Sequence, residues 1–165
     1  MPVDYSPSDA YMELSFRPIV ELIPYVRKFV TEFYTRMIDD RDAVSRVALA
    51  THELLENAVR YSVDGETKVR IEVLAGEPGK RVLVRTWNRT NTKHEGVVRA
   101  MFDAMTAAPD PFLHYQDLMR RTAKVTNASG LGLARIRAEA EMALNYSVTD
   151  GILCIEAETN VEART

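Results

Sequence analysis

This sequence has few cysteines, few histidines and no excess of positive charge, and each of these features argues against a class of protein. One cysteine among 165 residues excludes an internal disulfide framework, and three scattered histidines offer no zinc cluster. A formal net charge of -3 argues against a general nucleic-acid-binding surface. The N-terminus is polar and acidic, and no apolar run is long enough to span a membrane. We therefore expect a cytoplasmic protein with no nucleic-acid partner and no membrane partner.

The rest of the composition predicts one globular domain of mixed structure. Apolar residues make up 46% and charged residues 27% of a chain that is long enough to bury a sizeable core. Period-two alternation predicts strands, and spacing of apolar residues by three and four predicts helices. The expected strands cover 12–18, 68–75, 81–88, 145–148 and 152–158. The expected helices cover 19–38, 42–61, 96–105, 112–124 and the part of 129–143 that follows its two glycines. Because these elements are grouped without regular βαβ alternation, we expect an α+β fold, a two-layer sandwich.

Three polar residues share one stripe of the predicted helix 42–61. Glu53, Asn57 and Arg60 are spaced four and three apart, beside the apolar stripe that would pack on the sheet. One interpretation is a solvated helix face with a favourable Glu-to-Arg spacing. The other is a nucleotide site, because carboxylate and carboxamide oxygens suit a hard cation such as Mg²⁺ and a guanidinium suits phosphate.

A second motif, SGLGLARI, places Gly130 and Gly132 immediately before a predicted helix in a chain with only seven glycines. The two glycines can be turn residues that need a positive φ. They can also leave backbone N–H groups facing a phosphate, because a helix N-terminus carries unpaired donors and a partial positive charge. Taken alone, neither motif decides between its two interpretations.

Together the two motifs resemble those of the GHKL ATP-binding superfamily, which includes histidine kinases, gyrase, Hsp90, MutL and the anti-sigma-factor serine kinases. HELLENAVRYS is similar to its N-box and SGLGLARI to its second glycine box, and the elements follow in the family's order. The resemblance covers 12–158 and implies the Bergerat fold, a mixed, largely antiparallel sheet covered on one face by helices. It also implies an N-terminal extension over 1–11, a lid over about 89–128 and a C-terminal tail over 159–165.

The resemblance implies a role for each residue of the two motifs. Glu53 resembles the general base of the serine kinases and ATPases, whereas phosphotransfer histidine kinases usually carry Asn there. By the same resemblance Asn57 would hold Mg²⁺ and Arg60 would approach phosphate. The residues that would cradle the phosphates through backbone N–H groups are Ser129, Gly130, Leu131 and Gly132. The implied cofactors are therefore ATP and Mg²⁺.

One position departs from the family. Asn88 stands where the adenine-reading aspartate of the first glycine box belongs, and no glycine follows until Gly96. The side-chain oxygen of an asparagine can still accept a hydrogen bond from the adenine amino group, without the charge. An asparagine at this strand end, followed by a helical lid, is similar to the SiaB-type kinases, which phosphorylate a small partner protein.

Two functions follow as hypotheses. The first is a regulatory switch protein, a Mg-ATP-dependent serine/threonine kinase that phosphorylates a partner such as a STAS-domain anti-sigma-factor antagonist; Glu53 and Asn57 favour it. The second is a non-catalytic binding module that sequesters a sigma factor or antagonist without ATP, which the missing first glycine box favours. An ATPase with a conformational cycle is disfavoured, because no transducer domain follows Thr165. The oligomeric state stays open, with a homodimer as one option.

Overall fold

The computed structural model describes residues 10–17, 20–76, 79–124 and 130–162. A short 3-10 turn precedes the first helix and a π turn (η2) follows the last one. In chain order the elements are β1 (Ala10–Phe16), η1 (Val20–Leu22), α1 (Ile23–Met37), α2 (Arg41–Tyr61), β2 (Thr67–Gly76), β3 (Gly79–Arg89), α3 (Thr92–Ala107), α4 (Pro111–Thr122), α5 (Leu131–Arg135), η2 (Ile136–Ala140), β4 (Ala143–Thr149) and β5 (Ile152–Val161). No helix in these described segments is both long and apolar enough to cross a membrane.

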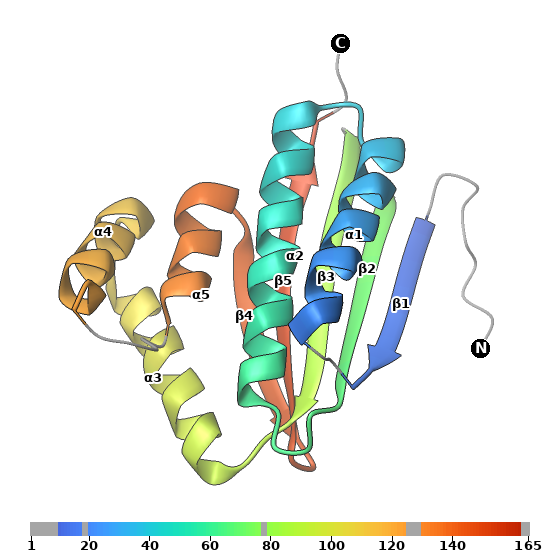
Figure 1. Ribbon diagram of the computed structural model, residues 1–165. Helices are drawn as coiled ribbons and strands as arrows, with labels where there is room; N and C mark the ends of the chain where they lie inside the picture. The colour runs from blue at the N-terminus through green and yellow to red at the C-terminus, as the bar shows by residue number, and fades with distance from the viewer. Residues whose placement is uncertain (1–9, 18–19, 77–78, 125–129, 163–165) are drawn as a thin grey trace.

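The five strands form one sheet in the order β1-β2-β3-β5-β4, and α1, α2 and α5 cover one of its faces (Figure 1). The predicted two-layer α+β sandwich is therefore confirmed. All four strand pairs are antiparallel, so the sheet that was expected to be mixed and largely antiparallel is antiparallel throughout. The reason is that the chain, after three helices, re-enters the sheet at its β4 edge, and β5 then turns back to pair with β3.

The first two helices begin where their sequences favour a start. α1 begins at Ile23, so Pro24 lies in its first turn. The N–H that proline lacks would have no partner within the helix at this position, so no helical hydrogen bond is lost. α2 is capped by Asp40, whose carboxylate accepts hydrogen bonds from the backbone N–H groups of Asp42 and Ala43. Its buried side chains include those of the predicted apolar stripe, so α2 presents its polar stripe at the edge of the layer. The members of that apolar stripe are Val47, Ala50, Leu54, Ala58 and Tyr61.

The last helix differs from the single long helix that was predicted after the two glycines of 129–143. An α-helical stretch of five residues, α5, is followed by the wider π turn of η2, and the helical backbone ends where Glu141 adopts a left-handed φ of 54°. The wider turn keeps Ile136 and Ala140 buried against the core. Apolar spacing alone does not distinguish this change of helix type from a regular α-helix.

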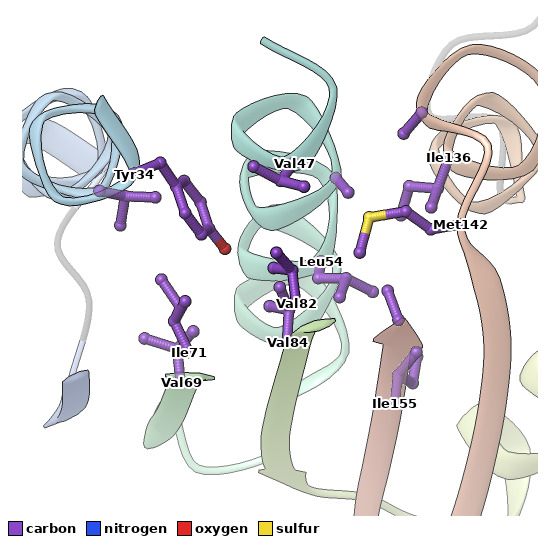
Figure 2. Close-up of a cluster of buried hydrophobic side chains, with 14 of the residues drawn as sticks. Tyr34, Val47, Leu54, Val69, Ile71, Val82, Val84, Ile136, Met142 and Ile155 are labelled. Carbon is purple, nitrogen blue, oxygen red and sulfur yellow. The ribbon is translucent and has the colours of Figure 1, made fainter. Parts of the chain in front are cut away.

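The core lies between the helices and the covered face of the sheet, and Figure 2 shows Tyr34 of α1 pointing its hydroxyl toward α2. That hydroxyl lies 2.8 Å from Oγ1 of Thr51. Thr51 donates its own proton to the carbonyl oxygen of Val47 at 2.7 Å, so Tyr34 is the donor to Thr51. Burial raises the pKa of Tyr34 far above its ordinary value, which keeps this donor protonated.

We expect Tyr34→Phe to lower the free energy of unfolding by about 1 kcal/mol, because one buried hydrogen bond is lost while the ring still fills its site. Thr51→Val should cost more, about 1–3 kcal/mol, because it leaves the buried Tyr34 hydroxyl without its acceptor. Equilibrium urea unfolding of both variants and the wild type at neutral pH measures the two values. A Tyr34→Phe variant that is the less stable of the two contradicts this direction of the hydrogen bond.

Candidate functional site

A polar cleft of about 220 Å³ lies between α2, α4 and the glycine turn that begins α5. In Figure 1 α5 lies between α2 and α4, so the cleft is built by segments that are far apart in the sequence. The lining residues are Glu53, Glu56, Asn57, Arg60, Tyr115, Gly130, Leu131, Gly132 and Arg135. The structure therefore brings the polar stripe of α2 and the glycine motif together, as the sequence predicts.

The side chain of Glu53 is largely enclosed by the cleft and is only 14% exposed. Its Oε1 accepts a hydrogen bond from Nη1 of Arg135 at 3.1 Å. Arg135 also donates through Nε to Oε2 of Glu139 at 2.8 Å. The carboxylate of Glu53 is thus paired with a cation that also lines the cleft, while its other oxygen faces the glycine turn.

The two glycines are needed for different reasons. Gly130 has a φ of +90°, a left-handed conformation that suits glycine, and a Cβ atom there would lie 2.9 Å from the sulfur of Met101. A Cβ atom on Gly132 would lie 2.6 Å from Oε2 of Glu53 and 3.7 Å from Nδ2 of Asn57. Gly130 therefore makes the turn, and Gly132 lets the α5 backbone approach the polar stripe of α2.

The other predicted site residues of the two motifs also lie at this cleft. Asn57 is half-buried, one helical turn after Glu53, and Arg60 is exposed at the rim. Leu131 is the first residue of α5 and lines the cleft between the two glycines. Ser129, the first predicted member of the glycine turn, lies outside the described residues.

Asn88 does not line this cleft. It is 4% exposed at the end of β3, and its Nδ2 donates to the carbonyl oxygen of Arg89 at 3.3 Å. Asn88 borders a separate cavity of about 370 Å³. Trp87 also lines this cavity, and so does Thr67, the cross-strand partner of Asn88. Oγ1 of Thr67 is buried with no hydrogen-bond partner in the part of the chain that the structure describes. Asn88, the residue that was expected to contact adenine, thus lies at a different cavity from the cleft that Glu53 lines.

The first turn of α3 contacts the end of α2 near the level of Asn88. Nδ1 of His94 lies 3.0 Å from the carbonyl oxygen of Tyr61, so Nδ1 carries the proton of this hydrogen bond. The rings of Tyr61 and His94 also meet edge to face, 5.6 Å apart. Val98, one turn further along α3, is fully buried. A helix therefore begins directly after β3 and packs on α2.

Three residues of the cleft were missed by the sequence reasoning. Glu56 and Arg135 belong to the two motifs that were recognised, and their positions within those motifs could have suggested them. Tyr115 comes from α4, and no local pattern marks it as a site residue. Tyr115 is 7% exposed. Its burial is the main cause that raises the pKa of its hydroxyl, and the negative charge of Glu139 is the second.

The cleft fits the phosphates and metal of a nucleotide better than a whole nucleotide. Its volume is below the 300–1,000 Å³ of typical ligand pockets, so the base would need space outside it. Mg²⁺ is commonly held by one or two protein groups together with substrate phosphates, for which the oxygen of Asn57 is suitable. Among the described residues, no group of three or more His, Cys, Asp or Glu could hold a metal ion. A metal at Asn57 would therefore depend on phosphate for its other ligands.

No protein-family model matches the sequence, and no curated protein matches it. Among solved structures, the crystal structure of the SiaB–SiaC complex from Pseudomonas aeruginosa contains a similar chain, with a TM-score of 0.62 and 12% sequence identity. The match covers 91% of this chain and 89% of that chain. At this identity the likeness shows a shared fold, in agreement with the α+β sandwich described above.

Proposed function

We propose that this chain is a regulatory protein kinase of the GHKL type, which transfers the γ-phosphoryl group of ATP to a serine or threonine of a small protein partner. The observation that carries the proposal is the meeting of two motifs in one cleft, where Glu53 and Asn57 face Gly132. The likeness to a chain of the SiaB–SiaC complex supports a protein as the partner. A STAS-domain antagonist is the class of partner that we propose.

In this proposal each polar group of the cleft has one task. Mg-ATP supplies the phosphoryl group and the neutralising charge. Glu53 takes the proton of the acceptor hydroxyl, Asn57 offers its oxygen to the metal, and Arg60 contacts phosphate. Backbone N–H groups at the start of α5 add further donors for phosphate oxygens. Positioning and charge neutralisation supply most of the rate enhancement in this class of reaction.

A second candidate function is a binding module that grips a sigma factor or antagonist without ATP. The observation that favours it concerns the surroundings of Asn88, the residue that was expected to contact the base of a nucleotide. There the hydrogen bond and ring contact between His94 and Tyr61 fasten α3 to α2, and Asn88 borders a different cavity. A nucleotide with its phosphates in the cleft would then hold its base away from Asn88.

Calorimetry of ATP binding to the purified chain, with and without Mg²⁺, separates the two functions. The partner is sought beside the gene or by pull-down from the native cell, and is then used in a phosphotransfer assay. Magnesium-dependent binding followed by transfer to the partner supports the kinase. Tight binding of the partner by a chain that takes up no Mg-ATP supports the module and overturns the kinase.

We expect Asn57→Ala to weaken Mg-dependent ATP binding by roughly 10- to 100-fold, because the metal loses its protein ligand. Binding measured without Mg²⁺ should change much less. Asn145→Ala is the matched control, since Asn145 is an exposed asparagine of β4 that does not line the cleft. Equal affinity of Asn57→Ala and wild type for Mg-ATP, measured by calorimetry, contradicts the role of Asn57.

A further inference from the structure

Arg135 joins two carboxylates at the wall of the cleft. Its Nη1 donates to Oε1 of Glu53 at 3.1 Å and its Nε donates to Oε2 of Glu139 at 2.8 Å. These contacts, with Glu139 first, raise the pKa of the guanidinium above its ordinary value. Arg135 is 40% exposed, whereas Glu53 is only 14% exposed, so the pair lies at the entrance with the carboxylate on the inner side. Arg135 is thus a fixed cation beside the proposed base.

The two oxygens of Glu53 have different surroundings. Oε1 is held by Arg135, whereas Oε2 lies so near the Cα of Gly132 that an added Cβ would come within 2.6 Å of it. The same Cβ position is 3.7 Å from Nδ2 of Asn57. Oε2 therefore lies on the side of the carboxylate that faces the glycine turn and Asn57. The ion pair and the glycine contact together restrict the rotation that would exchange the two oxygens.

We propose that Arg135 is a positioning residue that orients Glu53 so that Oε2 is the oxygen that accepts the proton. This inference rests on the proposed kinase function. As the O–H bond of the acceptor hydroxyl breaks, its proton goes to Oε2 and the hydroxyl oxygen forms a bond to the γ-phosphorus. The bond from that phosphorus to the β-phosphate oxygen breaks, and ADP leaves. Arg135 acts through orientation, because a general base must stay within hydrogen-bond reach of the proton it takes.

Substitution of Arg135 tests the orientation directly. We expect Arg135→Gln to lower kcat for phosphotransfer roughly 10- to 100-fold, while KM for ATP changes less than about threefold. Arg135→Lys should recover part of the loss, since it keeps the charge but not the planar donor geometry. Arg46→Gln is the matched control, because Arg46 forms a 3.2 Å ion pair with Glu141, is 36% exposed and does not line the cleft. This control should keep the wild-type kcat.

A double-mutant cycle distinguishes positioning from general structural support. In a Glu53→Gln background, Arg135→Gln should lower kcat little further, because the group that it orients can no longer take a proton. A nucleotide-free measurement is also available. The ¹⁵N signals of the Arg135 guanidinium in NMR spectra should shift in Glu53→Gln and stay unchanged in Arg46→Gln.

The outcomes separate this inference from the kinase proposal. Wild-type kcat in Arg135→Gln overturns the positioning role and leaves the kinase intact. If the effects of Arg135→Gln and Glu53→Gln on kcat multiply in the double variant, the positioning role is also overturned and the kinase proposal is kept. A wild-type chain that never phosphorylates its partner overturns the kinase, and the positioning role falls with it whatever the NMR spectra show.

Discussion

Glu53→Gln is expected to keep Mg-dependent ATP binding and to lose phosphotransfer to the partner by roughly 10²- to 10⁴-fold in kcat. The amide has the size of the carboxylate but cannot take the proton of the acceptor hydroxyl. Because Glu53 pairs with a partly exposed arginine, the free energy of unfolding should fall by less than about 1 kcal/mol. Calorimetry with ATP and transfer of labelled phosphate to the partner measure binding and chemistry separately.

The control for this variant is Glu141→Gln. Glu141 is 71% exposed and pairs with Arg46, so this substitution also breaks one ion pair with an arginine but lies outside the cleft. It should leave both binding and transfer as in the wild type. Transfer at the wild-type rate by Glu53→Gln would contradict the role of the base, and loss of ATP binding would assign Glu53 to the nucleotide instead.

The fold was predictable because its elements are marked locally. Alternation in β2 and β3 and the apolar stripe of α2 each reflect burial on one face, which the sequence carries directly. Element starts were less accurate where a cap decides them. α3 begins four residues before its predicted start at Gly96, because the side chain of Asn91 accepts a hydrogen bond from the backbone N–H of His94.

The cleft was predictable where its residues share a helix stripe or a glycine turn. The spacing places Glu53 and Asn57 on one stripe, and the resemblance to a known family supplied their role as site residues and their meeting with Gly132. Arg135 is 82 residues from Glu53, and its ion pair depends on how α5 packs on α2. Asn88 lines a different cavity, which no local pattern of the sequence records. Contacts between elements that no recognised motif links are what the sequence reasoning could not supply.

Gly132→Val is expected to abolish detectable Mg-ATP binding and phosphotransfer while the chain still folds. Any Cβ at this position lies 2.6 Å from Oε2 of Glu53 and 3.7 Å from Nδ2 of Asn57, so the side chain fills the space between α5 and the polar stripe. The nearest atom belongs to the end of a side chain rather than to backbone, so Glu53 can swing away. The cost in stability should therefore be about 1–3 kcal/mol. Calorimetry and urea unfolding measure the two effects on the same sample.

Gly96→Val supplies the comparison that decides between a binding role and a structural role for Gly132. Gly96 is also a helical glycine, and a Cβ atom there would meet nothing within 4 Å. Its replacement should change stability by about 0.5 kcal/mol or less and leave ATP binding intact. If Gly132→Val unfolds under the assay conditions, so that binding is lost with the fold, Gly132 is a packing residue. If Gly132→Val stays folded and binds Mg-ATP as the wild type does, the α5 backbone is not where phosphate is held, and the binding module becomes the better account of the cleft.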